Sequence, residues 1–70
     1  MYTLVGVNGN AYSIMGYVAR ALREQNLSNK IESYYDEAMS SDYNHLISVS
    51  LKYLEEANAK EEGNAKEEEY

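Results

Sequence analysis

The stretch YNHLISVSLKYLEEA, residues 43–57, decides the fold of this chain. Its apolar and small residues recur at steps of three and one along the chain, which is the period of an amphipathic α-helix. The positions in this stripe are Tyr43, Leu46, Ile47, Ser50, Leu51, Leu54 and Ala57. Val49 and Tyr53 widen the apolar arc beyond what one neighbouring helix would cover. We therefore expect a long helix that begins near residue 42 or 43 and needs cover on more than one side.

Two shorter helices are predicted before this stretch. The first spans about residues 10–25, with Asn10 as its N-cap, because an Asn side chain accepts hydrogen bonds from the free amides of a first turn. Its apolar stripe is Ala11, Ile14, Met15, Val18 and Leu22. The second spans about residues 29–39 after Ser28, its N-cap. Its stripe is Ile31, Tyr35, Ala38 and Met39, with Tyr34 at the margin. Gly16, inside the first helix, costs about 1 kcal/mol relative to Ala, and a close crossing with another helix would explain it.

The first ten residues permit several interpretations. Residues 2–6 contain strand-forming side chains in a run too short for a helix, so we predict a short strand there. The loop that follows is a hinge where a strand becomes a helix, or a type I′ hairpin turn at Asn8-Gly9. The third interpretation is an anion site, because a glycine loop before a helix N-terminus presents backbone amides to negative charge. Its candidate ligand residues are Gly6, Asn8, Gly9 and Asn10. The Lys of a Walker loop and the third glycine of a dinucleotide fingerprint are both missing.

The composition changes after residue 57. The segment Asn-Ala-Lys-Glu-Glu occurs at residues 58–62 and again at residues 64–68, and nothing in residues 58–69 is apolar and larger than Ala. Such a segment buries too little surface to offset the entropy lost on ordering. We therefore expect a single small helical domain over residues 1–57 and an acidic low-complexity tail, frayed or disordered, over residues 58–70. The predicted fold class is mostly α, with a short N-terminal strand or hairpin followed by a three-helix mini-domain.

Charge and residue types exclude several classes of function. The 70 residues have a formal net charge of −6, from 12 acidic and 6 basic residues. Phosphate binding needs clustered Lys and Arg, so we do not expect direct binding to nucleic acid. Without Cys and with a single His, the chain has few metal ligands, and we expect no metal and no cofactor. The absence of a long apolar run and of a secretory signal favours a cytoplasmic protein without a membrane span.

No catalytic group is predicted. His45 has Asp42 three residues before it, but Asp42 is better placed to cap the long helix, and His45 is expected to lie at the boundary of the core. The adjacent acid pairs are Asp36-Glu37, Glu55-Glu56 and Glu61-Glu62. Neighbouring helical residues point about 100° apart, so such pairs do not converge on one ion or substrate. We therefore expect that the chain is not an enzyme.

Two segments carry a resemblance to a known family. LVGVNGNAY at residues 4–12, followed by IMG at residues 14–16, and EAMSSDYNHL at residues 37–46 resemble motifs of small uncharacterised proteins from bacteria and their phages or prophages. That family's motifs are similar to LVGxDGNAF and EAxSGDYDHL. This chain departs from them with Asn8, Tyr12 and Ser41 in place of Asp, Phe and Gly. The resemblance covers about residues 4–54, and it implies a mobile-element context without implying a reaction.

Assembly and binding are the functions that the sequence favours. A lone strand needs a partner, and the wide apolar arc of the long helix needs cover, so we expect a homodimer. The predicted interface residues are Tyr2, Leu4, Val49 and Tyr53. The predicted function is that of a small acidic interaction or regulatory protein that binds another protein, one version being an acidic mimic of nucleic acid. The alternative is a small module that binds an anion or ligand at the loop of residues 6–10.

Overall fold

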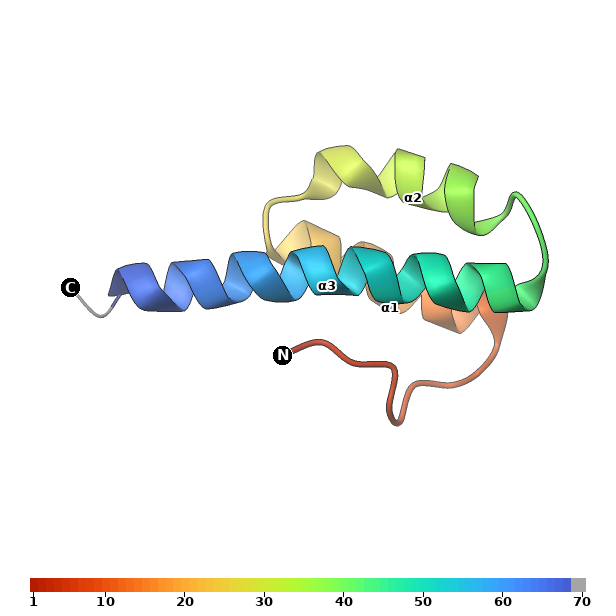
Figure 1. The fold of residues 1–70 in the computed structure, drawn as a ribbon, viewed down its shortest axis with the longest axis horizontal. Coiled ribbons are helices and arrows are strands. Elements are labelled where there is room, and N and C mark those ends of the chain that lie inside the picture. Colours follow the sequence, from red (N-terminus) through yellow and green to blue (C-terminus); the bar gives the residue numbers. More distant parts are fainter. Residues whose placement is uncertain (69–70) are drawn as a thin grey trace.

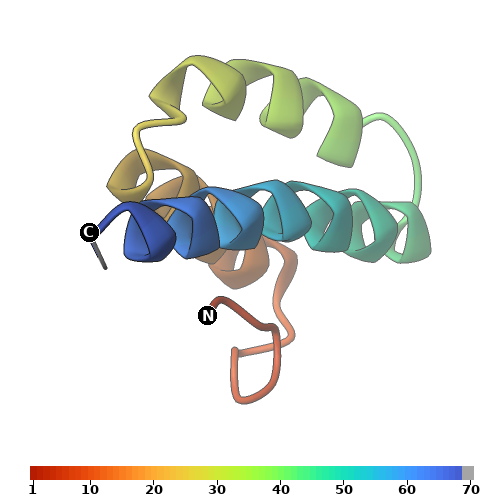
Figure 2. The same ribbon diagram turned by 60° about the vertical axis from the view of Figure 1, so that its left-hand side comes forward.

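The fold is a three-helix mini-domain, as predicted. The computed structural model describes residues 1–68, and the side chains of residues 1–63. Its helices are α1 (Ala11–Glu24), the short 3₁₀ helix η1 (Ser28–Lys30), α2 (Ile31–Ala38) and α3 (Tyr43–Glu68). α1 and α3 run in one direction and α2 runs in the opposite direction, so that α1 and α2 are antiparallel (Figures 1 and 2). α3 packs against both, and it projects beyond them at its C-terminal end (Figure 1).

Local side-chain chemistry fixes both ends of α1. The Asn10 side chain accepts a hydrogen bond from the Tyr12 amide (2.8 Å), which confirms Asn10 as the N-cap. At the other end, Asn26 adopts a positive φ of 60°. This conformation lets the Leu27 amide donate to the Leu22 carbonyl (2.7 Å) and the Asn26 amide to the Arg23 carbonyl (3.2 Å), which is the Schellman pattern. The chain therefore reverses sharply after α1 and leads into η1 and α2.

The predicted strand over residues 2–6 is not found, and neither is the predicted hairpin. The Val7 amide donates to the Leu4 carbonyl (3.1 Å), and Gly6 has a φ of +83°, as in a type II turn. This turn ends the extended run at Val5, while residues 11 and 12 already belong to α1, which removes the hairpin's second strand. The hinge interpretation is the one that agrees with the structure, except that the element before the hinge is irregular and not a strand.

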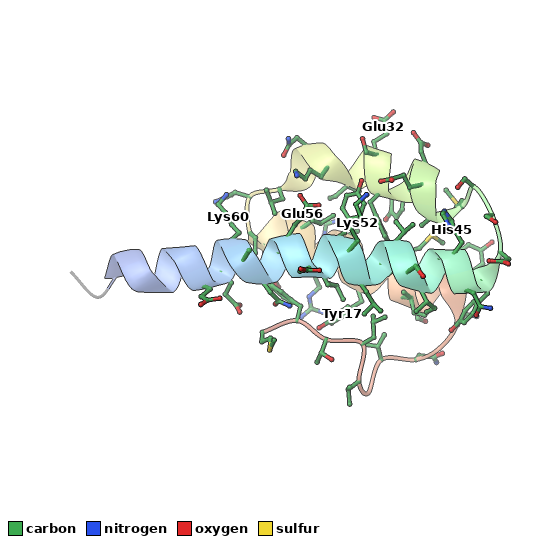
Figure 3. The ribbon with its side chains drawn as sticks, in the orientation of Figure 1. Tyr17, Glu32, His45, Lys52, Glu56 and Lys60 are labelled. Atoms are coloured by element: carbon green, nitrogen blue, oxygen red, sulfur yellow. The ribbon has the colours of Figure 1, made fainter. Side chains whose placement is uncertain are left out.

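Side chains of the helices supply the hydrogen bonds that a partner strand would have made. The Asn58 side chain accepts from the Tyr2 amide (2.6 Å) and donates to the Tyr2 carbonyl (2.9 Å). The Thr3 amide donates to the Tyr17 hydroxyl (3.1 Å). Because these backbone groups are satisfied by α1 and α3, the segment lies along the helices in irregular form. Figure 1 shows it below α3, and the labelled Tyr17 lies beside it in Figure 3.

The core lies where the three helices meet. Its buried apolar residues are Ile14, Met15, Val18, Ala19, Ala21, Leu22, Tyr34, Ala38, Leu46, Val49, Tyr53, Leu54 and Ala57. Tyr34 was expected at the margin of α2, but it is completely buried, and its hydroxyl shares a hydrogen bond with buried Ser50 (2.7 Å). The small Ser50 leaves room for the tyrosine ring and also satisfies its polar end.

The buried arc of α3 is turned relative to the predicted stripe. Val49 and Tyr53 are buried, with exposed fractions of 7% and 6%, whereas Leu51 is 51% exposed. The Tyr53 ring packs on Tyr34 of α2, with ring centroids 5.2 Å apart. The chain itself therefore covers the apolar arc on the side of Val49 and Tyr53, but this cover does not reach Leu51. α3 also continues past residue 57 through Glu68, so the first copy of the repeat, residues 58–62, is helical. That residues 58–70 form a separate tail stays a prediction, and part of that tail lies outside the described residues.

Candidate protein-interaction surface

An exposed apolar surface lies between α1 and α2. We define the Tyr/Met surface by Tyr12, Met15 and Gly16 of α1, Tyr35 and Met39 at the end of α2, and Tyr43 of α3. Three of its side chains are strongly exposed: Tyr12 at 81%, Met39 at 59% and Tyr43 at 47%. Soluble proteins rarely leave contiguous apolar surface open without a use for it, and such patches mark interaction sites.

Two hollows indent this surface. One, of about 320 Å³, lies between α1, the α2–α3 turn and the start of α3, and the other, of about 240 Å³, lies between α1 and α2. They adjoin, because Tyr12, Met15 and Met39 line both. The rims combine aromatic rings with flexible thioether chains, which is the combination that proteins use to accommodate a partner's apolar side chains.

Gly16 lies in the second hollow and leaves part of it empty. A Cβ built at Gly16 would meet no atom within 4 Å. The close helix crossing that the sequence suggested is therefore wrong, since neither α2 nor the described part of α3 comes within 4 Å of a Cβ at Gly16. The glycine nevertheless has the cost of about 1 kcal/mol that a helix interior imposes. Because residue 16 has no side chain, the α1 side of the hollow stays open.

Several carboxylates border the Tyr/Met surface. Asp42 lines the first hollow, and its side chain caps α3 by accepting from the His45 amide (2.9 Å), as predicted. Glu32 and Asp36 are exposed on α2 and lie within about 60° of Met39 around the helix axis, at about 100° per residue. Figure 3 shows Glu32 pointing away from the bundle. Within residues 1–63, neither Glu32 nor Asp36 forms an ion pair.

The opposite side of α2 contains a polar cluster that joins it to α3. Glu37 accepts from the Tyr53 hydroxyl and from Lys52 Nζ (3.4 Å), and a second ion pair joins Lys30 to Glu56. The hydrogen bond to Glu37 and burial raise the pKa of Tyr53 to about 12. The same hydrogen bond, with the charge of Lys52, lowers the pKa of Glu37. This cluster therefore ties α2 to α3, and its groups already have partners.

His45 stabilises the end of α2. Its Nε2 donates to the Glu37 carbonyl (3.0 Å), to which the Ser40 hydroxyl also donates (2.7 Å). These bonds satisfy a carbonyl that the last turn of a helix leaves without an intrahelical partner. His45 thus lies at the boundary of the core, as expected from the sequence, in contact with backbone and a serine.

Two amides of the candidate anion loop, those of Val7 and Asn10, have acceptors within the chain. The Asn8 side chain accepts from the Asn10 amide (2.9 Å), and Asn10 in turn caps the Tyr12 amide. The Gly9 carbonyl accepts from the Tyr43 hydroxyl (2.6 Å), which ties the loop to α3. Gly6 lies in the separate turn at residues 4–7. The structure therefore brings Asn8, Gly9 and Asn10 together as a helix-capping loop and leaves Gly6 apart.

The four predicted interface residues fall into two groups. Val49 and Tyr53 are buried within the chain, so the expectation that they form an exposed outer arc of α3 is wrong. Tyr2 and Leu4 are partly buried and pack against the core. An open groove of about 680 Å³ lies between the N-terminal segment and α3, where Met1 (94% exposed) and Leu51 (51% exposed) line it. The homodimer stays a prediction.

Comparison with protein-family models, with curated proteins and with solved structures gives no match in any of the three. The resemblance to small bacterial and phage proteins therefore stays a prediction. Among residues 1–68, no helix combines the length and apolarity of a membrane span. No group of three or more His, Cys, Asp and Glu side chains within the described part of the chain is arranged to hold a metal ion.

The sequence did not reveal the Tyr/Met surface. Met39 and Tyr43 were assigned to apolar stripes that would face the core, because they fit the helical period. In the structure Met39 is the residue after α2 and Tyr43 is the first residue of α3, so both lie at the turn, where the period no longer decides burial. The available signal was Tyr12, an aromatic residue beside the stripe of the first helix and outside it.

Proposed function

We propose that this chain is a small protein-interaction module that binds another protein through the Tyr/Met surface. The observation that supports this most strongly is the grouping of Tyr12, Met39 and Tyr43, each about half exposed or more, around two adjoining hollows. Tyr and Met are enriched at the centres of protein interfaces. The remaining polar clusters have internal partners and structural roles, which favours binding over chemistry.

Two narrower versions of this function receive less support. An acidic mimic of nucleic acid would need a row of unpaired carboxylates along α2 and α3, but Glu37 and Glu56 pair with Lys52 and Lys30. An anion-binding module at residues 6–10 would need several amides turned toward one ligand, but the amides of Val7 and Asn10 already donate to Leu4 and Asn8 within the chain. Binding through an apolar surface requires neither feature.

Affinity capture from the native host tests the proposal. The wild-type chain should retain a specific protein, and the double variant Tyr12→Ser with Met39→Ser should lose it. Val5→Ser is the matched control, because Val5 is 86% exposed and belongs to none of the hollows described above. Retention of the same protein by the double variant would refute the Tyr/Met surface as the binding site. Failure of the wild-type chain to retain any protein above a scrambled-sequence control would refute the proposed function.

A further inference from the structure

We infer that the partner presents an amphipathic helix to the Tyr/Met surface, with basic residues along the edge that meets α2. This inference rests on the proposed function and names the chemistry of the partner. Three features carry it: the antiparallel arrangement of α1 and α2, the empty position at Gly16, and the unpaired carboxylates beside Met39.

The arrangement of the helices favours a helix as the occupant. The groove between two antiparallel helices is a site where a further helix packs, with its side chains entering the spaces between theirs. α3 packs against both α1 and α2, yet it leaves Tyr12 and Met39 exposed. A partner helix lying on the Tyr/Met surface would cover these residues and add a fourth helix to the bundle.

Gly16 indicates where the partner's backbone comes closest. Small residues let two helices approach, and within the described residues nothing beyond the adjacent residues and backbone of α1 lies within 4 Å of a Cβ at this position. The walls around Gly16 are formed by Tyr12, Met15, Tyr35 and Met39. A large apolar side chain of the partner, entering over Gly16, would contact all four.

The charged side chains beside the Tyr/Met surface determine which partner helices it favours. Glu32, Asp36 and Asp42 lie along the α2 side of the surface, and the first two form no ion pair within residues 1–63. On the α1 side, Arg20 pairs with Glu24 (3.4 Å), and Arg23, seven residues after Gly16, forms no ion pair within residues 1–63. The edge of the partner that meets α2 therefore gains from Lys or Arg, and an acidic edge would be repelled.

The chain's own C-terminal segment is a poor occupant. Its charged residues are two lysines and five glutamates over residues 58–69, and it has no apolar side chain larger than Ala. A second copy that offered this segment would bring acidic side chains against Glu32 and Asp36. A second copy of the chain is therefore not the proposed occupant. The experiment must still be able to detect self-association at this surface.

Methyl NMR spectroscopy tests the inference, because the chain has three methionines and two of them line the surface. The probe is a Leu/Lys amphipathic helical peptide, and its counterpart replaces every Lys with Glu. Titration of the Leu/Lys peptide should shift the methyl signals of Met15 and Met39 and leave Met1 unchanged. The Leu/Glu peptide should bind at least about fivefold more weakly, as expected for several lost ion pairs at a partly exposed rim.

Matched variants distinguish binding at the Tyr/Met surface from non-specific attraction of a basic peptide to an acidic protein. Asp36→Lys and Glu55→Lys change the net charge equally, but Glu55 lies on α3, away from the surface. Asp36→Lys should weaken binding about fivefold and Glu55→Lys less than about twofold. Gly16→Leu should abolish the shifts of Met15 and Met39, because its side chain would fill the hollow. Since no atom approaches a Cβ there, this variant should remain folded with an unchanged or raised Tm.

Four results would overturn the inference: no shift at Met15 and Met39, an equal response to both peptides, a shift confined to Met1, or shifts of Met15 and Met39 that depend on protein concentration without peptide. The last result would assign the surface to a second copy of the chain. If the peptides fail while capture of a host protein still depends on Tyr12 and Met39, the proposed function stands and the helix inference fails.

Discussion

Replacing Gly16 with Ala should stabilise the fold although it alters the proposed binding surface. Ala in a helix interior is more favourable than Gly by about 0.8–1.0 kcal/mol. The gain should be realised in full, because a Cβ at Gly16 meets no atom within 4 Å and no packing is disturbed. In a domain of this size, 1 kcal/mol raises Tm by about 4–8 °C.

Two other glycines provide controls for this prediction. Gly63 also lies inside a helix with nothing within 4 Å of its Cβ position, but it lies beyond the buried core. Gly63→Ala should therefore raise helix content slightly and change Tm by less than about 2 °C. Gly6 has a φ of +83°, so Gly6→Ala should destabilise the fold by about 1–2 kcal/mol, the cost of a left-handed conformation.

Thermal unfolding followed by circular dichroism measures all three variants. The expected order of Tm is Gly16→Ala highest, then wild type together with Gly63→Ala, then Gly6→Ala. A lower Tm for Gly16→Ala than for wild type would refute the reasoning, because it would mean that a neighbour occupies the space beside Gly16. The uncovered surface between α1 and α2 would then not exist as described.

Three further predictions concern the core, the polar cluster and the C-terminal segment. Tyr34→Ala should destabilise the fold by about 3–5 kcal/mol because its ring is completely buried, whereas Tyr34→Phe should cost about 1 kcal/mol through the lost hydrogen bond to Ser50; urea unfolding measures both. The pKa of Tyr53 is raised to about 12 in the folded chain, so its contribution to stability is present below pH of about 10, the unfolded value, and is lost as pH rises toward 12. Tyr53→Phe should therefore flatten the fall in unfolding free energy over that pH window, and an unchanged slope would contradict the assignment. Deleting residues 60–70 should lower Tm by less than about 4 °C, since no apolar side chain larger than Ala precedes Tyr70 there; a larger drop would mean that the segment packs.

Local signals in the sequence were sufficient for the three helices and for the caps of α1 and α3. The predicted N-cap at Ser28 is wrong, because Ser28 lies inside η1 and neither η1 nor α2 begins with a side-chain cap. Asn10 and Asp42 cap α1 and α3 as predicted, because capping depends on one side chain and the amides two or three residues after it. The positive φ at Gly6 follows from the same kind of local chemistry. Such features need no knowledge of the tertiary structure.

The N-terminal segment could not be predicted from local signals. Its backbone is satisfied by Tyr17 and by Asn58, which is 56 residues away from Tyr2 and lies in the stretch whose composition indicated a tail. Strand-forming residues form a strand only where another strand can pair with them. In this chain the side chains of Tyr17 and Asn58 make the backbone hydrogen bonds instead.

The exposed surface also depended on tertiary structure. Helical periodicity showed that α3 has a wide apolar arc, but it could not decide which flank α2 would cover. Tyr53 packs on Tyr34 of α2 and Val49 is buried, whereas Leu51 stays exposed. Likewise, Met39 and Tyr43 fit apolar stripes and yet lie at the turn between α2 and α3, where packing decides their exposure.

The dissociation constant of the captured partner tests the central claim most directly. Tyr12 and Val5 are similarly exposed, at 81% and 86%, but only Tyr12 lines the hollows of the Tyr/Met surface. Calorimetric titration of the purified partner should show Tyr12→Ala weakening binding by at least about tenfold, as for an aromatic residue at an interface centre, with Val5→Ala within about twofold of wild type. Equal affinities for Tyr12→Ala and wild type, or a larger loss with Val5→Ala, would contradict the account.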